Sequence, residues 1–119
     1  MKLQELVNAI NRCVDRLDLV TARRYIEGNM ELLNDNKHRL KRNARELFDY
    51  LNTKTKDSLS RQEMNIVLSI NSRASRFDIR GLKFLIGNHP DLLLRDDVKL
   101  HLTADAKAIL EGMNIIRVS

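Results

Sequence analysis

Apolar residues recur at steps of three and four along most of the chain, which is the spacing of one face of an α-helix. The first such pattern predicts a helix over about residues 3–16. Asp18 then precedes a second apolar pattern, and its carboxylate can accept hydrogen bonds from the free amides of a first helical turn. We therefore expect a second helix to begin after Asp18 and to end at Gly28 and Asn29, which both tolerate a left-handed backbone.

Residues 30–38 are mostly polar and predict a short helical turn followed by a loop. Beyond them, Asn43 and Glu46 have the spacing of a capping box and predict the start of a third helix. This helix should run to about Leu51. A start nearer to Lys37 stays open, because the apolar pattern extends back toward that residue.

The second half of the chain follows the same order of patterns. Ser60 and Glu63 form a capping box before the next apolar run, and Asp78 stands where Asp18 stands in the first half. Pro90 pushes the residue before it away from helical backbone, so it predicts a helix end. The predicted helices cover about residues 61–76, 79–88 and 103–113.

Three segments are harder to assign. Residues 52–59 are polar and predict a linker between the two halves. Residues 98–102 alternate between apolar and polar side chains, so a short strand is an alternative there, although the equivalent stretch of the first half is too polar for one. Ile115, Ile116 and Val118 predict an extended tail that either docks on the core or reaches a partner.

The two halves resemble each other in sequence as well as in pattern. Residues 6–33 align with residues 66–93 at an offset of 60, and residues 39–52 align with residues 101–114 at an offset of 62. Identical pairs are Val7/Val67, Ile10/Ile70, Asn11/Asn71, Arg16/Arg76, Asp18/Asp78, Ile26/Ile86, Leu32/Leu92, Leu33/Leu93, Leu40/Leu102, Ala44/Ala106 and Asn52/Asn114. Such self-similarity indicates one supersecondary unit used twice.

The sequence thus predicts one all-α domain over residues 1–119. It consists of two tandem three-helix repeats of about 60 residues, the first over about 3–52 and the second over about 61–114. They would pack as a short right-handed helical array or as a single globule. Because helical arrays generally need about three units, we expect either close packing of the two or a homodimer that extends the stack.

Composition limits the partners and the compartment. Charged residues make up 31% of the chain and hydrophobic residues 43%, which suits helices with narrow apolar stripes. The single cysteine, Cys13, excludes an internal disulfide and is interpreted as an ordinary helix residue. No apolar run is long enough to span a bilayer, so we expect no membrane association and a cytoplasmic protein. The net charge of +5 permits an acidic partner, including nucleic acid.

No arrangement of side chains in the sequence indicates catalysis. The three histidines, at positions 38, 89 and 101, form no metal-binding pair, and no glycine-rich phosphate loop is present. The adjacent carboxylates Asp96 and Asp97 are interpreted as loop or helix-start residues. We predict that the chain is not an enzyme and holds neither metal nor cofactor.

Some polar residues are common to both halves. We expect Asn11 and Asn71, on the apolar sides of their helices, to bond backbone groups of a neighbouring turn rather than to line a groove. For Arg16 and Arg76 two interpretations stay open. They pair with the next helix or its capping aspartate, or they face one partner surface in register.

The densest basic stretch covers residues 37–45, and other cations follow the first helix of each half. A solvated helix face explains such charges, and a partner-binding patch is the functional alternative. The candidate partner-binding residues are Arg23, Arg24, Lys37, Arg39, Lys41, Arg42, Arg45, Arg76, Arg80 and Lys83.

The duplication, together with the absence of catalytic groups, favours a helical-repeat interaction module that binds a protein or peptide partner. The alternative is a basic nucleic-acid-binding regulator that contacts phosphates through the cations at 37–45 and 73–83. Few aromatic side chains are available for base stacking, which weakens that alternative.

Overall fold

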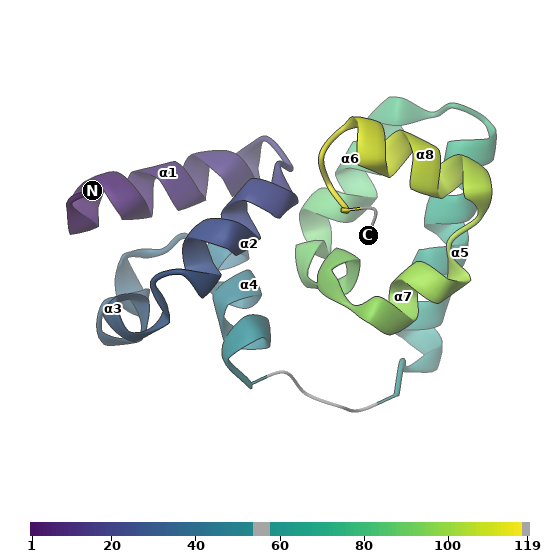
Figure 1. The fold of residues 1–119 in the computed structure, drawn as a ribbon. Helices are drawn as coiled ribbons and strands as arrows, with labels where there is room; N and C mark the ends of the chain where they lie inside the picture. Colours follow the sequence, from purple (N-terminus) through teal and green to yellow (C-terminus); the bar gives the residue numbers. More distant parts are fainter. Residues whose placement is uncertain (54–57, 118–119) are drawn as a thin grey trace.

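A computed structural model describes residues 1–53 and 58–117, and every regular element in those two stretches is helical. The elements form two groups, α1–α4 and α5–α8, with the corner between α1 and α2 pointing at the second group (Figure 1). The first group is α1 (Leu3–Asp15), α2 (Leu19–Glu27), α3 (Met30–Asp35), the 3-10 helix η1 (Lys37–Arg39) and α4 (Arg42–Thr53). The second is α5 (Arg61–Ser75), α6 (Ile79–Asn88), the 3-10 helix η2 (Pro90–Leu94), α7 (Asp96–His101) and α8 (Ala104–Gly112).

These elements confirm the all-helical prediction over the described residues and refine it. Each group has more elements than the three helices predicted, because short helical segments fill the stretches between the second and third helices. The strand alternative for residues 98–102 is wrong, since this stretch belongs to α7 and buries Val98. Part of the predicted linker, residues 54–57, and Val118 of the predicted tail lie outside the described residues.

Local capping sets several helix starts where the sequence predicts them. The Asp18 carboxylate accepts a hydrogen bond from the Thr21 amide at 3.3 Å, and Asp78 accepts one from the Gly81 amide at 3.0 Å. Ser60 begins α5 with a reciprocal capping box, as predicted. Each of these side chains satisfies an amide that has no partner within its own helix.

Two helix-end predictions are wrong in detail. Gly28 has right-handed backbone (φ −77°), so α2 ends without the left-handed residue expected there. Asn43 does not open α4 through a capping box. It lies inside the helix, which begins at Arg42, and its amide nitrogen donates to the Gly87 carbonyl oxygen of the second group at 3.0 Å. The side chain therefore joins the two groups instead of starting a helix.

The two shared asparagines tie their helices to distant backbone. The Asn71 side chain accepts a hydrogen bond from the Thr103 amide at 3.0 Å and donates one to the His101 carbonyl oxygen at 2.9 Å. The Asn11 side chain accepts one from the Lys41 amide at 3.0 Å. Both residues bond backbone groups as expected, but these groups lie about 30 residues further along the chain rather than in a neighbouring turn.

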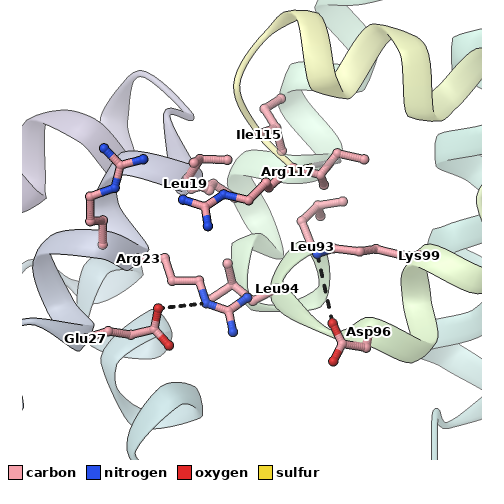
Figure 2. Close-up of a pocket in the computed structure, with 12 residues that line it drawn as sticks. Leu19, Arg23, Glu27, Leu93, Leu94, Asp96, Lys99, Ile115 and Arg117 are labelled. Atoms are coloured by element: carbon pink, nitrogen blue, oxygen red, sulfur yellow. Dashed lines mark hydrogen bonds and ion pairs between the residues drawn. The ribbon is translucent and has the colours of Figure 1, made fainter. Parts of the chain in front are cut away.

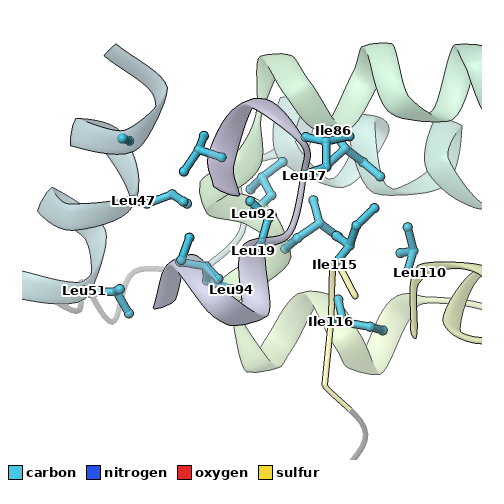
Figure 3. Packing of buried hydrophobic residues seen from close by; sticks show 14 of the residues in the cluster. Leu17, Leu19, Leu47, Leu51, Ile86, Leu92, Leu94, Leu110, Ile115 and Ile116 are labelled. Atoms are coloured by element: carbon cyan, nitrogen blue, oxygen red, sulfur yellow. The ribbon is translucent and has the colours of Figure 1, made fainter. Parts of the chain in front are cut away.

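A single apolar cluster runs through both groups. At the corner between α1 and α2, Leu17 and Leu19 are buried against the second group, whose Ile86, Leu92 and Ile115 lie beside them (Figure 3). Ile115 follows α8, so the part of the predicted tail that the structure describes docks on the core. Burial of these aliphatic side chains holds the two groups together.

Candidate partner-binding groove

A groove of about 590 Å³ opens where the two groups meet. One wall is α2, and the other is formed by η2, α7 and the segment after α8 (Figure 2). Its lining residues are Leu19, Val20, Arg23, Arg24, Glu27, Leu93, Leu94, Asp96, Lys99, Ile115, Ile116 and Arg117. The groove therefore exists only because residues from both halves of the chain come together.

The floor of the groove is aliphatic. Leu19 is the first residue of α2 and points inward directly after the Asp18 cap. Leu93 and Leu94 belong to η2, which begins at Pro90; a proline suits a first helical position because its missing N–H would have no partner there. These leucines form part of the core and are only 0%, 1% and 5% exposed, so the floor offers a ligand little more than the outermost atoms of Leu94.

The rim of the groove is mainly cationic. Arg24 and Arg117 are exposed, and Figure 2 shows Arg117 reaching across the opening. Arg23 is half-buried and pairs with Glu27 at 3.2 Å. Lys99 lies 4.0 Å from Asp96, a carboxylate that is almost fully exposed. Ion pairs as exposed as these contribute at most about 1 kcal/mol each.

Hydrogen bonds fix the wall that follows α8. The Asn114 carbonyl oxygen accepts a hydrogen bond from the Val20 amide at 3.3 Å. The side-chain amide of Asn114 donates a second hydrogen bond to the Asp18 carboxylate. Asn114 itself has left-handed backbone (φ 60°), which asparagine tolerates better than most residues. This turn holds Ile115 in the core and directs the chain toward Arg117 at the rim.

Two of the predicted binding residues, Arg23 and Arg24, lie in this groove, but the predicted cluster at 37–45 does not. The 37–45 cluster lies at η1 and the start of α4, where most of its cations bond neighbouring side chains or carbonyl oxygens of the same chain. The contacts are Arg39 to Gln4, Lys41 to Asp15, Arg42 to Glu46, and Arg45 to the carbonyl oxygens of His38 and Leu40. Lys37 is exposed. A smaller polar hollow of about 350 Å³ lies beside Lys41 and Arg42.

The remaining predicted cations lie on or next to α6. Arg76 donates to the Ser72 hydroxyl at 3.1 Å, whereas Asp78 pairs with Arg73 at 2.8 Å. The Gly81 amide and then Arg73 hold the pKa of Asp78 below its usual value. The hydrogen bonds of Arg76 go to Ser72 of its own helix, while its charge, together with that of Arg73, lowers the pKa of Asp78. A role of Arg76 at a partner surface stays a prediction. Arg80 and Lys83 are exposed.

The structure also reveals polar groups that the sequence did not single out. Lys99 and Arg117 line the groove, and nothing in their local sequence indicates it. Arg95 is buried and pairs with Asp97 at 2.7 Å and with Glu63 at 3.8 Å, joining the start of α5 to the start of α7. The hydrogen bond from Arg95 lowers the pKa of Asp97.

Cys13 is half-buried, and burial raises the pKa of its thiol, which disfavours the reactive thiolate. Across residues 1–53 and 58–117, no group of three or more His, Cys, Asp or Glu side chains is placed to hold a metal ion. Over the same residues, no helix has the length and apolar character needed to cross a bilayer.

Comparison of the chain with protein-family models, with curated proteins and with solved structures found no match.

Proposed function

We propose that this chain is a non-enzymatic interaction module that binds an acidic peptide segment of a partner protein in the groove between its two groups of helices. The observation on which the proposal rests is the chemistry of that groove: an aliphatic floor with Arg24, Lys99 and Arg117 at its rim. A segment that places carboxylates at the rim and a short apolar side chain against the half-buried Val20 and the outer atoms of Leu94 would match both features.

We further propose that the two groups are copies of one helical unit. Both contain a left-handed residue before a capping aspartate, Leu17 (φ 61°) and Phe77 (φ 55°). Both also contain an asparagine, at positions 11 and 71, that bonds backbone preceding the last helix of the group. In such an arrangement the groove would form where one unit stacks on the next, and stacked helical units generally bind partners through the concave surface that the stacking creates. A cytoplasmic location stays part of the same proposal.

The charges favour a peptide over nucleic acid. None of the described residues that line the groove has an aromatic side chain on which a base could stack, and the lining carries the carboxylates of Glu27 and Asp96 beside its cations. The cations at 37–45 that would contact phosphates are largely engaged with neighbouring groups of the chain. Nucleic-acid binding is therefore the competing outcome of the test.

The test is selection of random peptides displayed on phage, followed by titration of the enriched peptides by fluorescence anisotropy. We expect enrichment of Asp and Glu next to one or two aliphatic residues. Binding should weaken with rising salt and should fall at least tenfold in the variant Arg24→Glu/Arg117→Glu, because two favourable charge contacts become repulsive.

The matched control is Arg61→Glu/Lys107→Glu, which makes the same change of charge at exposed positions outside the groove. Enriched peptides that bind both variants equally would show that the groove is not the site. A single-stranded RNA of random sequence is titrated in parallel. Tight RNA binding that is lost in Arg39→Glu/Arg42→Glu, with no peptide enriched, would support the nucleic-acid alternative instead.

A further inference from the structure

Two aromatic side chains stand exposed at the start of α6 and within it. Phe77 is 73% exposed and lies in the left-handed turn just before the capping Asp78, whereas Phe84 is 71% exposed and lies inside the helix. Ile79, beside them, is also exposed. Single exposed apolar residues are common on protein surfaces, whereas three of them within one stretch of eight residues form an apolar patch of the kind found at contact sites. We call this surface the Phe77–Phe84 face.

The first half of the chain shows what such a face packs against. Leu17 occupies the position equivalent to Phe77, in the same left-handed turn one residue before the capping aspartate, yet it is only 8% exposed. The second group of helices covers it, and Leu92 of η2 lies close by (Figure 3). Val20 and Arg24, the counterparts of Arg80 and Phe84, also face the second group across the groove.

A matching surface is left open on α3. Leu32 is the counterpart of Leu92, but it is 42% exposed whereas Leu92 is 2% exposed. Within one chain this surface cannot meet the Phe77–Phe84 face, because α3 lies at one end of the molecule and α5, which leads into Phe77, lies at the other (Figure 1). Each chain therefore presents both halves of the same kind of contact, unused, at opposite ends.

The charges around the two surfaces are complementary. Arg80 and Lys83 are exposed on α6, whereas Glu31 and Asp35 are exposed on either side of Leu32 on α3. Pairing two α6 faces would bring like charges together, which disfavours a symmetric dimer through this helix. Pairing α6 with α3 brings opposite charges together around an apolar centre.

We propose that the Phe77–Phe84 face binds the surface around Leu32 on α3 of a second copy of this chain, so that copies associate head to tail. This contact would repeat between chains the packing that joins the two groups within one chain. A head-to-tail contact does not close on itself after two copies, so the assembly grows with concentration until its geometry closes a ring or a filament forms.

Sedimentation velocity from micromolar to near-millimolar concentration tests the proposal. The wild-type chain should rise above its monomer mass of 13.8 kDa as concentration increases. The variant Phe77→Asn/Phe84→Ser removes one surface, with asparagine chosen because it tolerates left-handed backbone. The variant Leu32→Glu removes the other. Each alone should remain monomeric, since loss of a residue at the centre of an interface typically weakens binding by about thirty-fold or more.

The decisive measurement is an equimolar mixture of the two variants. Each retains the surface that the other lacks, so the mixture should form a dimer and stop there. Leu68→Ser, a change at another exposed leucine, is the control and should associate like the wild type. Circular dichroism verifies that every variant is folded.

Any of three results would overturn the proposal. The wild-type chain could stay monomeric at every concentration, the Leu32→Glu variant could still self-associate, or the equimolar mixture of the two variants could fail to form a dimer. The groove residues are unchanged in all of these variants, so failure here leaves the peptide-binding proposal standing.

Discussion

One backbone conformation occurs at two positions with opposite surroundings, and this gives a direct test of the packing. Leu17 and Phe77 both have positive φ, at 61° and 55°. This region costs a residue with a side chain about 1–2 kcal/mol, whereas glycine adopts it freely. The perturbation is therefore the same at both positions: Leu17→Gly and Phe77→Gly.

The two substitutions should change stability in opposite directions. At position 77 the lost side chain is mostly solvated, so relief of backbone strain outweighs the greater unfolded-state entropy of glycine. We expect Phe77→Gly to stabilise the fold by about 0.5–1 kcal/mol. At position 17 the lost leucine is buried between the two groups, and emptying such a site costs about 2–5 kcal/mol. Because relief of backbone strain offsets part of this cost, Leu17→Gly should lower the free energy of unfolding by about 2 kcal/mol.

Urea unfolding followed by circular dichroism at 222 nm measures both effects, at protein concentrations low enough to keep copies dissociated. A difference of about 3 kcal/mol between the variants corresponds to a gap of at least about 1 M between their urea midpoints. Equal destabilisation by both substitutions would refute the reasoning, because it would mean that Phe77 is packed as tightly as Leu17. Equal stabilisation would mean that the two groups of helices do not rest on Leu17.

Further predictions concern single polar and glycine positions, with the same urea assay for each. Asn71→Ala should lower the free energy of unfolding by about 2 kcal/mol, and Asn11→Ala should lower it by about half as much, because the Asn71 side chain makes two backbone hydrogen bonds and the Asn11 side chain makes one. Equal losses of stability in the two variants would contradict this reasoning. Gly81→Ala should destabilise, because its Cβ would collide with the aspartate that caps α6, whereas Gly87→Ala meets open space and should stabilise by about 0.5–1 kcal/mol. The pKa of Asp97 is lowered in the folded state, so its contribution is present above the unfolded value of about 4 and is lost as pH falls below it. Asp97→Asn should therefore flatten the acid side of the stability profile, and an unchanged profile would contradict the role of its ion pair.

The sequence by itself determined the local structure. The starts of α2, α5 and α6 follow from Asp18, Ser60 and Asp78, whose side chains bond amides within the next turn. The inward faces of the long helices follow from apolar spacing. Both signals act over three to seven residues, so no knowledge of the rest of the chain is needed to interpret them.

Tertiary structure decided which of these surfaces are covered and where the groove lies. Leu17 and Phe77 share one turn geometry, yet only Leu17 is buried, because another group of helices lies against it. Asn43 has a capping pattern but bonds Gly87, far along the chain. Arg24 and Arg117 meet at one rim only because the segment after α8 is bonded to the corner between α1 and α2. Such contacts join residues tens of positions apart, and local spacing carries no information about them.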